Sequence, residues 1–469
     1  MRRLAVAMFG VALATSPVVA GDLRLPALTR TTLPNGLRLV LAEYHELPLI
    51  EFYLLVGAGA AEDPVGEEGL AALTANTLKG GAGRRSATAL AEDIESLGGH
   101  ISVQPGTEAT IVTGEFLAAD FVAGLDLLRD VIMAPSFPRD EIRRARDQQL
   151  AGITAMLEDP SAIAEKCFAA FLYGGHPYGR PVDGRRKTVA KLGRSEVRDF
   201  YDRWYRPNNT MLVVVGDVAA ADAVRLVQGA FRDWKPRSDA VPVRMGPPVA
   251  VRERRVLLVD KVDATQAQIR VGNVSIRRSD PDYLAAQVAN TILGGGFTSQ
   301  LIEELRVKRS LTYGAWSQFA ARRVGGDFRM GTFTKSPTTV ETLALALAVE
   351  GRFREAPPAV KALTKAKAYL TGQFPLRLEP PEALAARLAE IEFHGLPRDD
   401  LETYGRRVAA TGPDEVARVA AAHMPRPDVV AIVVVGKAAE LRAPLEAKLG
   451  PIRVVTPEAC ADLAAAGGH

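Results

Sequence analysis

The sequence predicts an α+β protein of two homologous α/β sandwich domains, each with a mixed, largely antiparallel sheet flanked by helices. Three observations predict this architecture: an internal repeat, helix and strand patterns that do not alternate strictly, and a proline-rich break near the middle of the chain. The chain has 469 residues, enough for two domains of about 200 residues that each bury a full core.

The repeat consists of two segments that recur in the same order at nearly the same spacing. Residues 70–81, LAALTANTLKGG, match residues 284–295, LAAQVANTILGG, at eight of twelve positions. The sequence VVVG at residues 213–216 recurs at 433–436, each time shortly after an Arg-Pro pair. Chance could explain one alanine-rich match, but two matches in order make duplication the better explanation.

Each half is expected to open with a strand, at residues 50–56 and at residues 266–271. An alanine-rich helix that ends in a glycine cluster follows, then a second helix, strands and further helices. A buried valine-rich strand that ends in glycine comes late in each half. Prolines within residues 236–250 prevent regular pairing there and predict an interdomain linker. The expected domains and tail are residues 21–235, 251–450 and 451–469.

The first 20 residues are expected to be a secretory signal peptide. Arg2 and Arg3 give a short basic start, residues 4–15 form an apolar run, and residues 18–20 are small or short, so cleavage is expected after about Ala20. The apolar run is too short to span the ~30 Å of hydrocarbon in a bilayer, so we expect no membrane anchor. The mature protein is expected to be periplasmic or secreted.

The charge balance excludes nucleic acid as a partner. Lys and Arg number 58 and Asp and Glu 55, a net charge of +3 that falls by two, to +1, when Arg2 and Arg3 leave with the signal peptide. A near-neutral chain offers little long-range attraction to nucleic acid or to an acidic membrane. Of the six histidines, no two are close in sequence, which excludes a helical two-histidine metal motif.

Two cysteines are too few for a disulfide scaffold or a zinc ribbon. In an oxidising compartment Cys167 and Cys460 could form a disulfide. Cys167 lies in a stretch typical of a buried helical position, whereas Cys460 lies in an Ala/Gly-rich tail. The sequence therefore favours two unpaired thiols.

Six short motifs occur in a specific order and spacing. They are NGL at 35–37, GLA at 69–71, ESLGG at 95–99, HPYG at 176–179, RPNN at 206–209, and the run from the glycines to the serine at 294–310. Together they resemble the pitrilysin/insulinase superfamily of zinc peptidases, in its short, two-domain bacterial form, over nearly all of residues 28–450. The resemblance implies that the two domains form half of a clamshell.

In active relatives the helix after Gly-Leu-Ala carries His-x-x-Glu-His, and a glutamate from a later helix completes the zinc site. The resemblance places Ala72, Ala75 and Asn76 at the motif positions and Gly152, or its neighbour Ala151, at the distal one. Methyl groups neither ligate zinc nor abstract a proton, and a neutral amide is a poor ligand. We therefore expect a packing helix and no metal on this chain.

Other polar residues of the first half are expected to be structural. Four acids directly before the packing helix are expected in a solvated loop: Glu62, Asp63, Glu67 and Glu68. His176 is expected to be a histidine that the backbone satisfies. His100 adjoins a strand that pairs with extended substrate in relatives. Pro105 lacks an N–H group, so peptide binding along this edge is expected to be impaired.

The second half keeps residues that the first half has lost. Gly294, Gly295 and Gly296 are expected to end a helix and to let another backbone approach closely. Arg306 and Tyr313 have the seven-residue spacing of an Arg/Tyr pair that hydrogen-bonds substrate in active relatives. A guanidinium and a phenol suit that role, because both donate to carbonyl oxygens that gain negative charge. The bland alternative is a surface arginine and an ordinary strand tyrosine.

These expectations predict the subunit without metal of a heterodimeric zinc endopeptidase. A homologous partner chain would supply zinc and the general base, and the two chains would enclose an extended peptide. The alternative is a scaffold or peptide-binding protein of the same family without enzymatic duty. A stand-alone hydrolase of other chemistry is disfavoured, since the chain has no Gly-x-Ser-x-Gly elbow and no convincing Cys/His pair.

Overall fold

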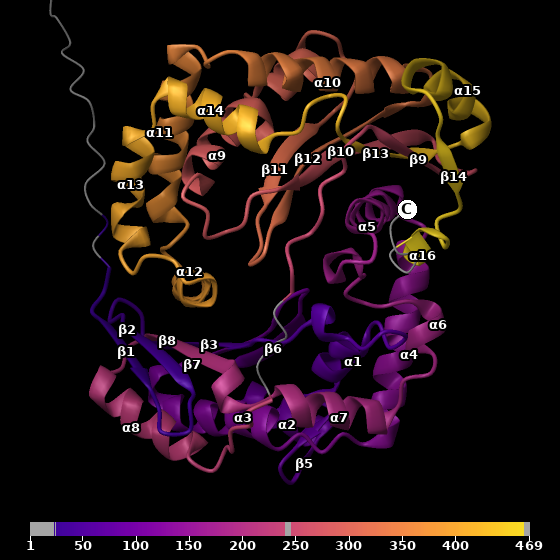
Figure 1. Cartoon of the computed structure of the whole chain (residues 1–469). Helices are drawn as coiled ribbons and strands as arrows, with labels where there is room; N and C mark the ends of the chain where they lie inside the picture. The colour runs from indigo at the N-terminus through magenta and orange to yellow at the C-terminus, as the bar shows by residue number, and fades with distance from the viewer. Residues whose placement is uncertain (1–22, 24, 240–244, 464–469) are drawn as a thin grey trace, which may run out of the picture.

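The computed structural model describes residues 23, 25–239 and 245–463. The predicted signal peptide, the middle of the predicted linker and the end of the tail lie outside these residues. Two six-stranded sheets lie one above the other, each covered by helices on the side that faces away from its partner (Figure 1). This architecture confirms the predicted fold class.

Five of the six strands have the same order in the two sheets, and the edge strand differs: β1 is antiparallel to its neighbour, whereas β14 is parallel to its neighbour. The first runs β1-β2-β8-β3-β7-β6 and the second β14-β9-β13-β10-β12-β11. The strands of the first are β1 Leu28–Thr32, β2 Arg38–Glu43, β3 Leu49–Val56, β6 His100–Pro105, β7 Thr110–Leu117 and β8 Thr210–Gly216. Those of the second are β9 Arg255–Asp260, β10 Gln266–Ser275, β11 Ala315–Ala320, β12 Gly326–Lys335, β13 Ala431–Gly436 and β14 Arg453–Val455.

Strand directions support the duplication. In each sheet the central pairs are antiparallel, whereas β2 with β8 and β9 with β13 are parallel. The valine-rich strands β8 and β13 are fully buried, as predicted. The strands at 50–56 and 266–271 are present as β3 and β10, but each sheet already has a strand earlier in sequence, β2 or β9. The segment expected as a tail also supplies β14, which pairs with β9.

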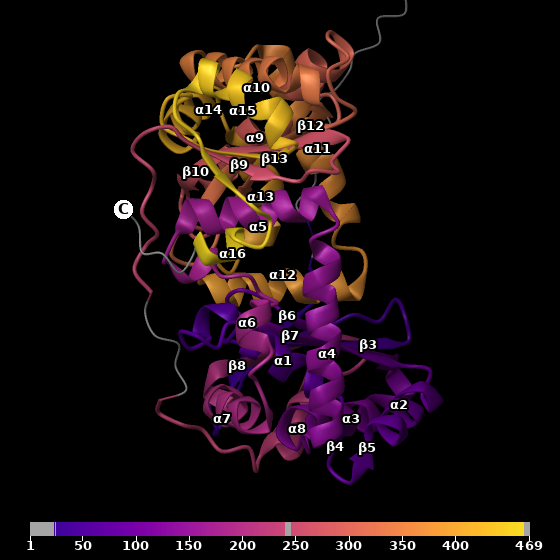
Figure 2. The same ribbon diagram turned by 90° about the vertical axis from the view of Figure 1, so that its right-hand side faces the viewer.

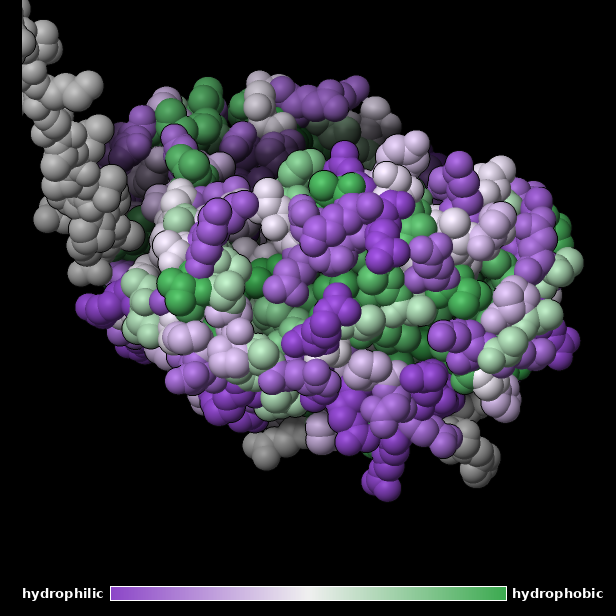
Figure 3. Space-filling view, turned by 90° about the horizontal axis from the view of Figure 1, so that it is seen from above, coloured by the Kyte–Doolittle hydropathy of each residue, from purple (hydrophilic) through white to green (hydrophobic). Residues whose placement is uncertain are grey.

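The outer helices of each sheet come from its own half of the chain (Figures 1 and 2). In the first half they are α1 Leu70–Thr77, α2 Ala87–Ser96, α3 Phe121–Met133, α4 Arg139–Met156, α6 Arg186–Val189, α7 Arg194–Trp204 and α8 Ala220–Phe231. In the second they are α9 Tyr283–Asn290, α10 Thr339–Glu355, α11 Val360–Leu376, α13 Asp400–Ala410, α14 Pro413–His423 and α15 Ala438–Leu449. From above, over α10, α14 and α15, apolar residues are interrupted by polar ones (Figure 3). In the described part of the chain, no helix is long and apolar enough to cross a membrane.

The inner face of each sheet is covered by a helix from the other half. Helix α5, Pro160–Tyr173, packs on β10 and β13 of the second sheet, and α12, Pro381–His394, packs on β3 and β8 of the first. Figure 1 shows both helices between the sheets. Two contiguous sandwiches, as the sequence predicts, do not describe this exchange, because each half completes the core of the other.

Helix α5 is also held by buried charges. The Glu165 carboxylate accepts hydrogen bonds from Arg270 Nε at 2.5 Å and from Arg329 Nη1 at 2.7 Å. Arg329 in turn donates to both oxygens of Asp327, which also accepts from Tyr173 at 2.7 Å. Both arginine side chains are under 10% exposed, so their charges depend on these carboxylates.

We expect Glu165→Ala to lower the free energy of unfolding by about 3 kcal/mol, because two buried guanidinium groups lose a partner. This is the low end for a broken buried pair, since Glu165 itself is 37% exposed. Urea unfolding of the variant measures the loss. Glu158→Ala is the matched control: Glu158 lies beside α5 but is 77% exposed, so its pair with Lys261 should contribute little to stability. Equal losses in the two variants would contradict the assignment.

The contact of α12 with the first sheet contains a carboxyl group without a hydrogen-bond partner. Glu51 on β3 is 1% exposed, and the structure gives its buried Oε1 atom no partner among the described residues. Burial, together with the charges of Glu382 and Glu115, raises the pKa of this carboxyl from 4.5 to about 8. Folding therefore favours the protonated form.

Stability should consequently fall as pH rises from about 5 to 8, because the group is protonated in the folded state and ionised in the unfolded state. One such carboxyl costs about 1.4 kcal/mol per pH unit inside this window. Glu51→Gln should reduce the slope of stability against pH by that amount, and Glu92→Gln, at an exposed position on α2, should leave the slope unchanged. Urea unfolding at pH 5, 6, 7 and 8 measures both. An unchanged slope in Glu51→Gln would show that the group ionises normally.

A disulfide joins Cys167 on α5 to Cys460 at the start of α16, Cys460–Leu463. The expectation of unpaired thiols is therefore wrong. The expected position of Cys167 is nevertheless correct, because Cys167 is a fully buried residue of a helix. The sequence does not show that the two cysteines meet in the tertiary structure, where β14 returns the chain to the second sheet, on which α5 lies. The bond thus ties the exchanged helix to the chain end that follows its sheet (Figure 2).

Candidate functional site

The packing helix α1 begins at a buried turn that an aspartate organises. Gly69 precedes it with φ of 100°, in the left-handed region that favours glycine. Asp63 accepts hydrogen bonds from the backbone N–H groups of Gly69 and Ala71, both at 2.7 Å. Burial raises the pKa of Asp63 to about 7, although these hydrogen bonds lower it. The expected solvated loop is wrong for Asp63 and Glu68, which are 3% and 5% exposed.

The four positions of the degenerate zinc motif lie on two helices in contact, α1 and α4. Ala72 and Ala75 are fully buried in the packing of α1, and Asn76 is exposed. Gly152 on α4 is exposed, with open space where a Cβ would lie. The two alanine methyl groups, the neutral amide of the asparagine and the glycine, which has no side chain, do not fit a zinc site. Ala72 and Ala75 therefore hold α1 in place, and none of the four positions offers metal chemistry.

The strand beside α1 is an edge whose peptide-binding groups are partly occupied. Strand β6 pairs only with β7 in the first sheet, and the pairing directs the backbone groups of Ile101, Val103 and Pro105 outward. Lys79 donates from its ammonium to the Ile101 carbonyl at 2.7 Å. Pro105, the last residue of β6, has no N–H group to offer. A peptide adding to this edge would have to displace Lys79.

The equivalent helix of the second half continues where the sequence predicted a stop. After α9 the chain forms a π-helical segment, η5 Thr291–Gly295, so Gly294 and Gly295 extend the helix and only Gly296 ends it. The expected helix stop is wrong by two residues. The expected close approach is present, because a Cβ on Gly294 would lie 2.5 Å from the backbone nitrogen of Ser317 on β11.

Arg306 and Tyr313 lie on a second π-helical segment and the loop after it. Segment η6, Ile302–Val307, carries Arg306, and Ser310 then turns the chain with φ of 54°. The Arg306 guanidinium lies 5.2 Å from the centre of the Phe297 ring. Tyr313 is 79% exposed. π-Helical turns are rare and occur often at functional sites.

 

The structure brings both residues to one pocket. The pocket of Arg306 and Tyr313 has a volume of about 570 Å³. Its wall also includes Gln266, Phe333 and Lys335 from the open ends of β10 and β12. The two residues therefore face one solvent-accessible space, as a pair that contacts a shared ligand would.

Sequence reasoning missed several residues of this neighbourhood. Phe297 directly follows the three glycines, and its position there was the available clue. Lys335 could not be found, because only the register of β12 with β10 places it opposite Gln266. Lys79 was missed because its contact with β6 depends on how α1 packs.

His176 is held by the backbone on both sides, as predicted. Its Nδ1 atom accepts from the backbone N–H of Tyr178 at 3.2 Å, and its Nε2 atom lies 3.0 Å from the carbonyl oxygen of Gly246. Burial lowers the pKa of this histidine, which favours the neutral ring. These contacts leave His176 a structural role.

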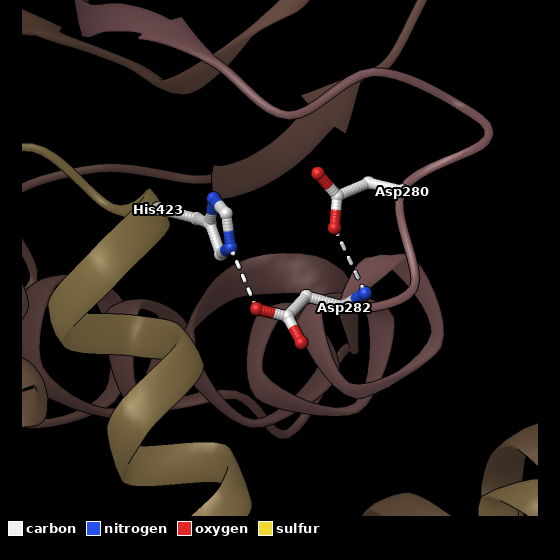
Figure 4. A group of neighbouring side chains, drawn as sticks. All are labelled: Asp280, Asp282 and His423. Atoms are coloured by element: carbon white, nitrogen blue, oxygen red, sulfur yellow. Dashed lines mark hydrogen bonds and ion pairs between the residues drawn. The ribbon is translucent and has the colours of Figure 1, made fainter.

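One group of side chains in the described part of the chain has the composition of a metal site: Asp280, Asp282 and His423 (Figure 4). The carboxylate of Asp282 is already paired with cations, and Asp280 accepts the backbone N–H of Asp282 at 2.9 Å. Arg418 donates to both oxygens of Asp282, at 2.7 and 2.8 Å, and His423 Nε2 lies 3.0 Å from the same carboxylate. These partners lower the pKa of Asp282 to about 2. The group therefore fastens α14 to the start of α9.

Two family models match consecutive parts of the chain. The model described as "Insulinase (Peptidase family M16)" matches residues 39–185, and the one described as "Peptidase M16 inactive domain" matches residues 191–370. Degenerate motif positions fall within the first match, and Arg306 and Tyr313 within the second.

Relatives and solved structures agree with these matches. An uncharacterized zinc protease of Streptomyces coelicolor is 26% identical over 87% of this chain and 89% of its own. A protein of Helicobacter pylori named "Non-peptidase homolog YmxG" is 23% identical over 84% of this chain and 91% of its own. The crystal structure of a peptidase M16 inactive domain from Pseudomonas fluorescens superimposes with a TM-score of 0.83 and 26% identity, covering 88% of this chain and 98% of that one.

Proposed function

Because this chain belongs to peptidase family M16, the insulinase family, we propose that it is the subunit without zinc of a heterodimeric zinc endopeptidase. One contrast carries the proposal. The positions that would ligate zinc hold alanine, asparagine and glycine, whereas Arg306 and Tyr313 lie together at an accessible pocket. A homologous partner would supply zinc, which activates water for attack on the peptide.

In this proposal the chain binds and orients the peptide. The guanidinium of Arg306 presents several fixed N–H donors and the Tyr313 hydroxyl one more, so both donate to carbonyl oxygens of an extended substrate. Donors placed where negative charge develops lower the barrier of the reaction. Phe297 restricts the Arg306 side chain through their cation–π contact.

We also propose an oxidising compartment, the bacterial periplasm or the exterior of the cell. The Cys167–Cys460 disulfide supports this, because such bonds persist mainly in oxidising compartments. The basic and apolar start of the sequence supports it independently.

A non-enzymatic scaffold is the second candidate, and the edge of the first sheet favours it. Lys79 occupies the Ile101 carbonyl and Pro105 removes a donor, so β6 offers a peptide few groups. The relative named as a non-peptidase homolog is compatible with either candidate.

An assay with a quenched peptide library separates the candidates. The mature chain is tested alone and mixed with a co-encoded relative that carries His-x-x-Glu-His, with zinc supplied throughout. Cleavage only in the mixture, or a clear rise over the partner alone, is the expected result. Cleavage by this chain alone would overturn the assignment. A stable complex that is no more active than the partner would favour the scaffold.

A further inference from the structure

The inner face of the second sheet has a covered part and an open part. Helix α5 covers the part around Arg270 and Arg329, and its Glu165 neutralises both. Toward the start of β10 and the end of β12 the sheet extends past these contacts. Gln266 pairs there with Lys335, and both line the pocket of Arg306 and Tyr313.

The open part gathers positive charge without a matching acid. Three cations line the pocket, Arg306, Arg309 and Lys335, and no carboxylate does. Among the described residues, the one ion pair within 4.0 Å of these cations joins Arg309 to Glu341 at 3.9 Å. Both partners of that pair are more than half exposed, so it contributes little.

The aromatic side chains supply the rest of a binding site. Tyr313 and Phe333 line the same pocket, whose volume of about 570 Å³ suits one or two side chains of a peptide. Methylene groups of a ligand can pack on these rings while its charged end reaches the cations. A guanidinium binds a carboxylate through two parallel hydrogen bonds, which an amide cannot match.

We propose that this pocket binds a carboxylate of the peptide, so that the site prefers acidic substrates. This rests on the proposed function, since it assumes that a peptide reaches Arg306 and Tyr313. The carboxylate has two possible sources, an Asp or Glu side chain and the C-terminus of the peptide. Arg309 and Lys335 determine the preference, and neither is needed for binding the backbone.

Three fluorescein-labelled peptides of one unstructured sequence test the proposal by fluorescence anisotropy with the full mature chain. The first has a central Glu and an amidated C-terminus, the second a central Gln and an amidated C-terminus, and the third a central Gln and a free C-terminus. We expect the first or the third to bind about 5–10-fold more tightly than the second at low salt. Whichever binds more tightly identifies the source of the carboxylate.

The variant Arg309→Gln/Lys335→Gln should remove this difference, because the peptides with a carboxylate should then bind no more tightly than the second peptide. Lys448→Gln, at an exposed position on α15, is the control and should change nothing. Equal affinities of the wild type for all three peptides would overturn the preference for acid while leaving peptide binding intact. Absence of binding by every peptide would instead overturn the proposed function.

Discussion

Replacing Arg306 by alanine should lower kcat/KM of the proposed two-subunit peptidase by about 10²–10³-fold, the usual cost of losing one donor to a developing negative charge. The effect should appear mainly in kcat, because such a donor acts more strongly in the transition state than in the bound substrate. Steady-state kinetics with the peptide that the library assay identifies measures it. The kcat/KM of Arg306→Lys should lie between those of the wild type and Arg306→Ala, because lysine keeps the positive charge but lacks the planar guanidinium group.

The matched control is Arg225→Ala on α8, where the side chain is 72% exposed and far from the pocket in sequence and fold. It should leave kcat/KM unchanged. Thermal unfolding should be similar for both variants, because Arg306 has no ion pair among the described residues and is fixed only by Phe297. An Arg306→Ala enzyme with full activity would show that the arginine does not contact substrate.

Removing the disulfide should lower the free energy of unfolding by about 4 kcal/mol, near the top of the usual range. The cysteines are 293 residues apart in sequence, and a cross-link across a long loop restricts the unfolded chain most. Cys460→Ala tests this by urea unfolding. Both cysteines are fully buried. Cys460 is the better choice, because it begins a helix of four residues near the end of the described chain, whereas Cys167 lies within the long helix α5.

Reduction provides the control. A thiol reductant should destabilise the wild type to the level of Cys460→Ala and should leave the variant unchanged. A reductant effect in both proteins would point to a cause other than this bond. Equal stability of the variant and the oxidised wild type would contradict the prediction.

Local patterns predicted much of the fold. The buried valine-rich strands β8 and β13 and the repeated helices α1 and α9 are recognisable from periodicity, because their own residues determine them. Features that depend on the other half of the chain were not predictable in this way. The apolar face of α5 is the same whether it packs on its own sheet or on the other one.

The candidate site shows the same division. The spacing of Arg306 and Tyr313 was visible in the sequence, and the structure adds that they share a pocket. The burial of Asp63 was not predictable from the sequence, because a run of acidic residues normally indicates an exposed loop. Asp63 is buried because it accepts hydrogen bonds from backbone N–H groups at the start of α1. The pairing of Cys167 with Cys460 likewise required β14, a strand of three residues.

The exchange of α5 and α12 has a consequence for the nascent chain. The ribosome completes α5 long before it makes β13, the strand of the second sheet on which α5 packs. The inner face of the first sheet likewise stays uncovered until α12 is complete at residue 394. Until then two apolar faces remain open to water, which favours aggregation. Either half expressed alone should therefore be insoluble, whereas the halves produced together should assemble. An export pathway that keeps the chain unfolded until it is complete would suit such a protein.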